Sequence, residues 1–260
     1  MLDFEQQNGG SMKKFTVIGA AVTALLATPV IAADMPVKAP VAPTPVAIPY
    51  NWTGFYIGGH GGYGWSKKDW TDLFQTQLPT GWTDSDSQNG FFGGLQGGYN
   101  YQIKQWVFGI EGQVSWTDIK GYGLWRNPAG VITAESAHTD IHMLATLTGR
   151  LGIAWDRLLL YAKGGGAWVN EEHWQQDFAN GPRWSDVPRA TRTGWTVGGG
   201  LEYAFWENWS AKIEYDYMDF GTHRFPFVLL TTGQVFRYAD ITQKVHLVEV
   251  GINYRFNWSK

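Results

Sequence analysis

The sequence contains no cysteine, and charged residues make up only 17% of its 260 positions. Without cysteine the chain can form neither a disulfide framework nor a thiolate metal site. A net charge of −3 offers no basic surface of the kind that binds nucleic acid. The mean hydropathy of −0.25 excludes a bundle of transmembrane helices, because each such helix needs a run of about 18 or more apolar residues.

Glycine and aromatic residues are abundant instead. The chain has 33 glycines and 15 tryptophans, and aromatic residues account for 16% of the sequence. All three figures are high for a soluble domain, whereas the charged fraction is below the usual share of about 25%. The sequence is therefore rich in rings and glycine but poor in continuous apolar runs.

The N-terminal region has the three parts of a secretory signal peptide. Within residues 12–33 a basic pair is followed by a short apolar core and then by small residues. This order predicts export, with cleavage after Ala32 or Ala33. A membrane anchor is disfavoured because the apolar core is short and contains Pro29. Residues 1–11 contain acids that suit a signal head poorly, so we interpret them as a non-native or mis-started extension.

Residues 34–50 contain five of the 11 prolines. Proline fixes φ and cannot donate to a strand ladder, so this segment is predicted to be an extended periplasmic leader. The folded domain is expected to occupy residues 51–260.

From residue 51 onward, segments of about ten residues alternate large apolar side chains with glycine or polar ones. A period of two residues is typical of β-strands. The predicted strands are 51–65, 90–101, 106–116, 141–155, 158–168, 193–205, 209–217 and 244–256.

The connections between these strands alternate in length. Three are tight, at 103–105, 156–157 and 206–208, and four are much longer, at 66–89, 117–140, 169–192 and 218–243. Such long loops are uncommon inside compact domains, but outer-membrane barrels combine short periplasmic turns with long surface loops. We therefore predict an all-β fold, an eight-stranded antiparallel transmembrane β-barrel with three short periplasmic turns, four long surface loops and periplasmic termini.

Aromatic residues concentrate at both ends of the apolar strand faces. Indole and phenol rings prefer the boundary between lipid and water, so this distribution predicts two girdles. A soluble antiparallel sandwich would place its large rings at the centre of the core instead. The predicted girdle residues are Trp65, Trp116, Trp168 and Trp195 beside the long loops, and Trp106, Trp155, Trp209 and Tyr254 beside the short turns or the C-terminus.

The opposite strand faces carry five acidic and four basic residues. On the lipid side each Lys or Arg near the midplane would cost roughly 2–4 kcal/mol, whereas inside the barrel these groups can pair. Side chains about fill an eight-stranded interior, which favours a structural ionic cluster over an ion pathway. The predicted cluster comprises Glu111, Arg150, Lys163, Glu202, Lys212, Glu214, Asp216, Glu249 and Arg255.

Motifs of catalysis and metal binding do not occur in the sequence. The six histidines are scattered without HExxH spacing, and there is no GxSxG elbow, so we predict no catalytic residue, no metal site and no cofactor. A competing hypothesis is a lipid-modifying membrane enzyme, with His246 and His142 near the long loops as its candidates. A transport role also stays open, either as a small porin or as a loop-mediated binder of an apolar ligand such as haem.

Four sequence strings carry a family resemblance: GFYIGGHGGYGW, WVFGIEGQVSW, LTGRLGIAWDRLLLYAKGG and VEVGINYRFNW. They resemble the outer-membrane immunogenic protein family of Gram-negative bacteria, small porin-like surface β-barrels with an OmpA-type membrane domain. The resemblance covers about 50–260, together with the signal peptide and proline-rich leader. It implies an exported, non-catalytic surface antigen of the cell envelope that contributes to envelope integrity.

The resemblance also suggests partners. Barrels of this family end their last strand in an aromatic residue that the barrel-assembly machinery reads, and either Phe256 or Trp258 fits that position. We further expect contact with outer-membrane lipid and lipopolysaccharide, and a possible host or small-molecule ligand at the loops. No nucleic-acid partner is expected.

Overall fold

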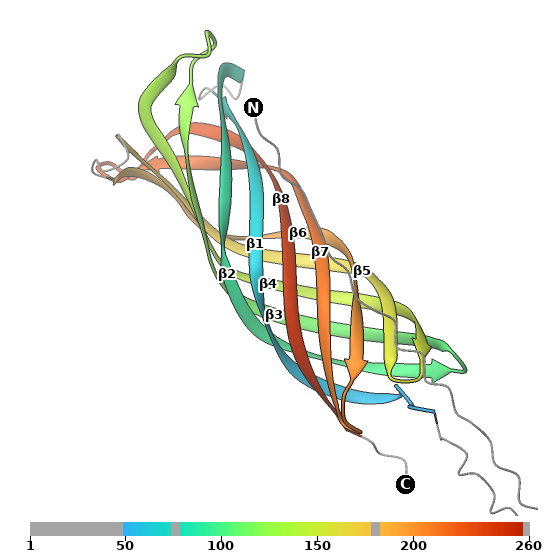
Figure 1. Cartoon of the computed structure of the whole chain (residues 1–260). Helices are drawn as coiled ribbons and strands as arrows, with labels where there is room; N and C mark the ends of the chain where they lie inside the picture. The colour runs from blue at the N-terminus through green and yellow to red at the C-terminus, as the bar shows by residue number, and fades with distance from the viewer. Residues whose placement is uncertain (1–48, 74–78, 178–182, 257–260) are drawn as a thin grey trace, which may run out of the picture. The chain divides into compact units, whose positions relative to one another are not determined.

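The folded part of the chain is a closed ring of eight antiparallel strands. The computed structural model describes residues 49–73, 79–177 and 183–256, so the predicted signal peptide, most of the leader and residues 257–260 lie outside the described residues. Each strand pairs with its neighbours in sequence, and β1 closes the ring by pairing with β8 (Figure 1). The strands are β1 Gly54–Leu73, β2 Pro79–Ile103, β3 Trp106–Arg126, β4 Ile132–Trp155, β5 Leu158–Asp177, β6 Arg183–Ala204, β7 Trp209–Leu229 and β8 Val235–Phe256.

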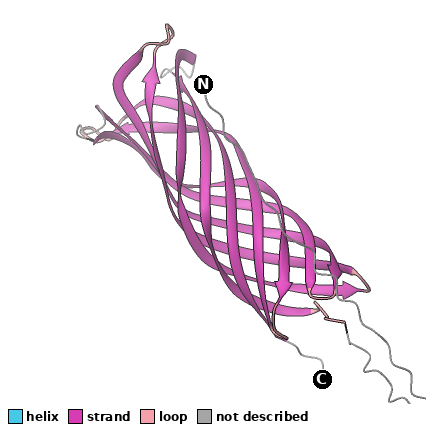
Figure 2. Cartoon of the chain, viewed as in Figure 1, coloured by secondary structure: helices cyan, strands magenta, loops and turns pink. Residues whose placement is uncertain are grey.

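Strands make up nearly all of the described chain (Figure 2). The predicted all-β, eight-stranded antiparallel barrel is therefore confirmed. The tight connections are also found where the sequence places them, after Ile103, Trp155 and Ala204. Within the described ranges no helix has the length and apolar character needed to cross a membrane.

The four segments predicted as long loops are mostly strand, which corrects the sequence-based prediction. At the end of the barrel opposite the tight turns, here called the upper end, β3 runs to Arg126 and β4 resumes at Ile132. Likewise β7 runs to Leu229 and β8 begins at Val235. The projecting ends are thus paired hairpins with short tips at 127–131 and 230–234, and Figure 1 shows them extending well past the middle of the barrel.

In these projecting hairpins the polar side chains face outward and the apolar ones face inward, the opposite of the membrane-spanning part, and this explains the wrong prediction. Up to Trp65 the outward side chains of β1 are apolar, but beyond it Lys67 and Asp69 face outward while Trp70 is buried inside. Outside the lipid layer the outer face contacts water, so it carries polar groups and the rings lie on the inner face. A prediction that requires a continuous apolar outer face therefore gives strands that are too short.

Glycines on β5 show why the narrow inner wall needs them. A Cβ added to inward-facing Gly165 would overlap the backbone carbonyl oxygen of Leu147 on β4. A Cβ added to its neighbour Gly164, which faces outward, would lie 3.5 Å from its nearest atom, the carbonyl oxygen of Thr196. Inside the ring, glycine is thus required by close backbone approach.

Limited proteolysis can test how far the strands extend. Trypsin should cut the purified, folded protein after Arg126, which is exposed and borders the tip at 127–131. It should spare Lys120, which is also exposed on the same strand but six residues inside the paired ladder, because cleavage requires local opening of the backbone. The sites can be assigned by mass spectrometry of the fragments, and comparable cleavage rates at the two positions would show that 117–126 is a loop after all.

Candidate functional site

The predicted girdle residues all lie on the outer face of the ring. Their rings are partly or largely exposed, and several touch one another, as Trp209 and Tyr254 do at a centroid distance of 5.1 Å. Between the two rows the outer wall is apolar. On β5, for example, this stretch runs from Leu158 to Trp168, and we take the corresponding part of each strand as its membrane-spanning segment.

Residues before β1 close the lower end of the interior. The indole nitrogen of Trp52 donates to the carbonyl oxygen of Asp156 at 3.1 Å, and the backbone nitrogen of Tyr50 donates to the Asp156 carboxylate at 2.9 Å. Asp156 lies in the β4–β5 turn, across the ring from β1. These bonds therefore hold the residues before β1 across the end of the barrel at which the tight turns lie. Arg255, one of the predicted cluster residues, stacks on the Tyr50 ring at 4.2 Å and donates to the backbone carbonyl of Glu207 at 3.1 Å.

All nine charged residues selected from the sequence are buried inside the barrel. Eight of them form what we call the lower ionic cluster: Glu111, Arg150, Lys163, Glu202, Lys212, Glu214, Asp216 and Glu249. Within it Arg150 joins β3 to β6, since its two terminal nitrogens lie 3.2 Å from Glu111 and 3.0 Å from Glu202. The cluster therefore links strands that are not neighbours in the ring.

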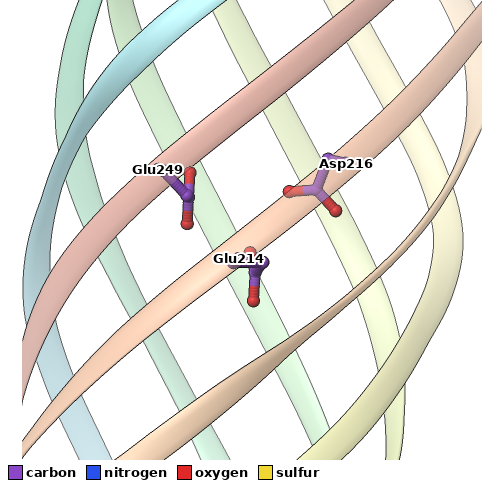
Figure 3. Close-up of side chains that lie close together, drawn as sticks. All are labelled: Glu214, Asp216 and Glu249. Atoms are coloured by element: carbon purple, nitrogen blue, oxygen red, sulfur yellow. The ribbon is translucent and has the colours of Figure 1, made fainter.

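Three acids of this cluster lie especially close together. The carboxylates of Glu214, Asp216 and Glu249 approach within 4.8 Å of one another on β7 and β8 (Figure 3). Lysine ammonium groups meet their charge: Lys163 Nζ lies 2.5 Å from Glu214 and 3.1 Å from Asp216, and Lys212 Nζ lies 2.8 Å from Glu249 and 3.2 Å from Glu214. The ammonium groups of Lys163 and Lys212 thus already balance the negative charge that a bound metal ion would otherwise balance.

Neutral side chains complete the lower ionic cluster. Gln113 donates to Glu214 at 3.2 Å and to Glu249 at 3.0 Å, and the Tyr56 hydroxyl donates to Glu111 at 2.8 Å. Tyr161 donates to Glu214, and Ser210 donates to Glu202 at 2.5 Å. Sequence reasoning missed these partners because it selected only charged residues, although the same two-residue alternation places them on the inner face.

An apolar layer lies above the lower ionic cluster. Side chains from six strands contribute to it: Phe92, Ile119, Ile141, Leu144, Ala167, Val169, Met218, Phe220, Val245 and Leu247. All are nearly inaccessible to solvent. This layer separates the lower cluster from the upper end of the barrel.

A second buried polar set, the upper ionic cluster, lies beyond the apolar layer and consists of the charged side chains of Lys68, Glu171 and Arg192 together with His173. The Glu171 carboxylate is 2.5 Å from Lys68 Nζ, 3.0 Å from Arg192 and 3.3 Å from His173. Arg192 also donates to the carbonyl oxygens of Gly221 and Ile241. Sequence reasoning missed this cluster because it assigned all four residues to loops.

His173 lies outside the membrane-spanning part of β5, above the upper girdle, which is the row of rings formed by Trp65, Trp116, Trp168 and Trp195. Burial, together with the positive charge of Lys68, lowers its pKa to about 4 against the opposing effect of Glu171. The imidazole is therefore neutral at pH 7. One of its nitrogens, Nδ1, lies 3.1 Å from the hydroxyl of Thr139.

Aromatic side chains close the upper end. Trp70, Trp125, Ala137, Phe225, Phe227, Ala239 and Ile241 form a buried cluster there. The Arg237 guanidinium lies over the Trp125 ring at 4.9 Å and contacts the Asp72 carboxylate at 3.5 Å. The interior is thus filled in alternating layers: rings, charges, apolar groups, charges and rings again.

The two histidines considered for lipid chemistry face outward and have other partners. His246 stacks on Trp65 at a centroid distance of 5.5 Å, and its Nδ1 is 2.8 Å from the Tyr215 hydroxyl. His142 lies 3.1 Å from Arg189 and 3.7 Å from Glu172. In the part of the chain that the structure describes, neither histidine contacts a serine hydroxyl.

The proposed assembly signal is at the end of β8. Phe256 is the last residue of that strand and faces outward with 42% of its surface exposed. The second candidate, Trp258, lies outside the described residues. Recognition of Phe256 by the assembly machinery stays a prediction.

Replacing one buried cation tests the lower ionic cluster. Lys163→Leu should lower the free energy of unfolding by about 3 kcal/mol, because the buried Asp216 carboxylate would lose its ammonium partner and Glu214 would keep only Lys212. The midpoint of urea unfolding in detergent micelles or lipid vesicles measures this. Lys120→Leu, at an exposed lysine of β3, is the control and should leave the midpoint unchanged. An unchanged midpoint for Lys163→Leu would contradict an essential ionic cluster.

Known proteins share both the sequence and the fold. The family model of the outer membrane protein beta-barrel domain matches residues 19–256. The 31 kDa outer-membrane immunogenic protein of Brucella melitensis is 34% identical over 252 residues, covering 93% of this chain and 99% of that protein. The 25 kDa outer-membrane immunogenic protein of Brucella abortus is 27% identical over 248 residues, covering 95% and 99%.

Among solved structures, the outer membrane protein OprG from Pseudomonas aeruginosa has the same fold. Its TM-score is 0.51 at 13% identity, and the match covers 80% of this chain and 99% of that chain. The apolar outer wall between two rows of aromatic rings agrees with location in the outer membrane. From the family match, the relatives and the closed eight-stranded ring, this chain belongs to the outer membrane protein β-barrel family.

Proposed function

We propose that this protein is a non-catalytic barrel that contributes to envelope integrity and to interactions at the cell surface. The observation that carries the proposal is the layered interior, which side chains fill from Trp52 at the lower end to Trp125 at the upper end. A wall that is apolar outside and a centre that is filled inside suit a protein whose role is to span and reinforce the membrane.

The filled interior argues against a small porin. An ion crossing the barrel would have to break the contacts of Arg150 and Lys163 with their carboxylates and then pass the apolar layer around Phe92 and Ile119. Removing one partner from such a buried pair costs about 3–5 kcal/mol. Two ionic clusters and an apolar layer in series therefore favour a closed barrel.

The projecting hairpins support the surface role. Above the upper girdle the outer face carries polar groups that include Lys67, Asp69, Lys120 and Arg224, so it suits water rather than lipid. The relatives from Brucella are named outer-membrane immunogenic proteins, which fits a family whose upper ends are exposed to the surroundings of the cell. The described tips at 127–131 and 230–234 are short, so the paired hairpins themselves would provide most of the contact surface.

Planar-bilayer recording tests the closed interior. The purified protein should give no steady conductance at neutral pH, because both ionic clusters and the apolar layer stay intact. Empty detergent micelles are the blank, and a heat-modifiable gel shift confirms that the reconstituted protein is folded. Regular stepwise currents that scale with the amount of protein would contradict the closed barrel and favour the porin.

A deletion strain tests the role in the envelope. Cells that lack the protein should become more sensitive to detergents and large antibiotics, and expression of the wild-type chain should restore resistance. Lys163→Leu is the informative variant, because a weakened barrel should restore resistance less well than Lys120→Leu at equal expression. Unaltered sensitivity of the deletion strain would remove the envelope role while leaving the fold unaffected.

A further inference from the structure

Two lysines face each other directly across the β1–β8 pair, immediately above the upper girdle. Lys67 and Lys244 are register partners, and both are exposed on the outer face. Two residues below them, Trp65 and His246 are also register partners, and their rings stack with an interplanar angle of 5°. Alternation puts each lysine on the same face as the ring below it, about 7 Å further along the strand.

Like charges placed directly opposite on neighbouring strands are unfavourable unless an anion lies between them. The acid closest to Lys67 is Asp69 on the same strand, at 3.6 Å, with both side chains more than half exposed. Such exposed ion pairs contribute little. The ammonium group of Lys67 is therefore only weakly compensated and stays accessible at the membrane surface.

The acid beside Lys244 is largely engaged. Asp219 lies opposite Lys244 on β7. However, its carboxylate accepts a hydrogen bond from the Tyr217 hydroxyl at 3.2 Å and another from the backbone nitrogen of Gly221 at 2.8 Å. Within residues 49–73, 79–177 and 183–256, Lys244 forms no ion pair.

The height of the two lysines matches a layer of lipid headgroups. Aromatic girdles mark the boundary between hydrocarbon and headgroups, and the lysines are roughly two residues beyond that boundary. They are at the upper end, away from the start of β1 and the end of β8. With the termini in the periplasm, as the sequence predicts, this end faces the outer leaflet. In that leaflet the fixed anions are phosphates on the sugar headgroup of a glycolipid.

An aromatic floor lies beneath the lysines. The His246 ring contacts Trp65 on β1 and lies 5.2 Å from the Tyr217 ring on β7, while its Nδ1 meets the Tyr215 hydroxyl. These rings give a continuous surface across β1, β8 and β7, on which a sugar ring and the first part of an acyl chain can pack. Phosphate above and rings below make a site for a phosphorylated sugar rather than for a free ion.

Another exposed lysine near the upper girdle shows that this arrangement is specific. Lys120 on β3 also points outward, but its Nζ is 2.5 Å from the Asp118 carboxylate. It faces Asn89 on β2 and Asp140 on β4, so it has no second lysine beside it. The chain thus contains a matched control for the lysine pair.

We propose that Lys67 and Lys244 bind a phosphate of the outer-leaflet glycolipid, with Trp65 and His246 packing against the sugar and acyl base below. The site depends on the outer-membrane position of the barrel. It does not depend on the interior being closed, so a conducting barrel would overturn the proposed function and leave this site standing.

Native mass spectrometry of the full folded protein, released from detergent with added lipid, tests the site. Diphosphorylated lipid A should bind more tightly than dephosphorylated lipid A or phosphatidylglycerol. The double variant Lys67→Gln/Lys244→Gln should lower the affinity for diphosphorylated lipid A by roughly 30-fold, because each lysine near a charged headgroup contributes about a factor of five. Lys67→Arg/Lys244→Arg should keep most of the binding, and Lys120→Gln should bind like the wild type.

Several outcomes would overturn the proposal. One is a double glutamine variant that binds diphosphorylated lipid A as the wild type does while showing the same heat-modifiable gel shift. Equal binding of dephosphorylated lipid A would show that the site does not recognise the phosphate. Equal binding of phosphatidylglycerol would show that it does not recognise the glycolipid. Displacement of lipid A by millimolar inorganic phosphate would indicate a free-anion site instead.

Discussion

The narrow closed ring is the constraint on which the rest of this structure depends. With eight strands, the interior has room for side chains and little else, so every inward group must fit and every inward charge must find a partner. Gly165 satisfies the steric part by leaving space for the backbone of Leu147. Lys163 satisfies the electrostatic part by bridging carboxylates on β7. The narrow interior thus accounts both for the glycines at close backbone approaches and for the pairing of the inward charges.

The same constraint divides the molecule along its axis. In the membrane the outer wall is apolar and the inner wall polar, whereas above the upper girdle the outer wall is polar and rings such as Trp70 and Trp125 move inside. The two arrangements meet at Trp65 and its partner His246. The proposed glycolipid site lies at this boundary, where a strand changes its outward residues from rings to cations within two positions.

Much of the lower half could be predicted from the sequence because two local features of each residue there, its polarity and its position in a two-residue period, indicate the same face. Glu111 and Lys212 are polar between apolar neighbours, and they lie on segments with strand periodicity, so they had to face inward. Lys68 and Arg192 carry the opposite signal, since their neighbours in sequence are also polar. Nothing local distinguishes them from loop residues, and the upper ionic cluster was therefore missed.

By itself the sequence determined the number of strands, their order, the tight turns and the inward face of the membrane-spanning part, because a two-residue period and the cost of charge in lipid act locally. Tertiary structure decided which charges meet, since Arg150 reaches Glu202 across strands that are far apart in sequence. It also decided that the upper segments are paired hairpins, because their ladders place rings on the inner face and polar groups on the outer face, the reverse of the membrane-spanning part. The opposition of Lys67 and Lys244 belongs to this second group, because only closure of the ring makes β1 and β8 neighbours.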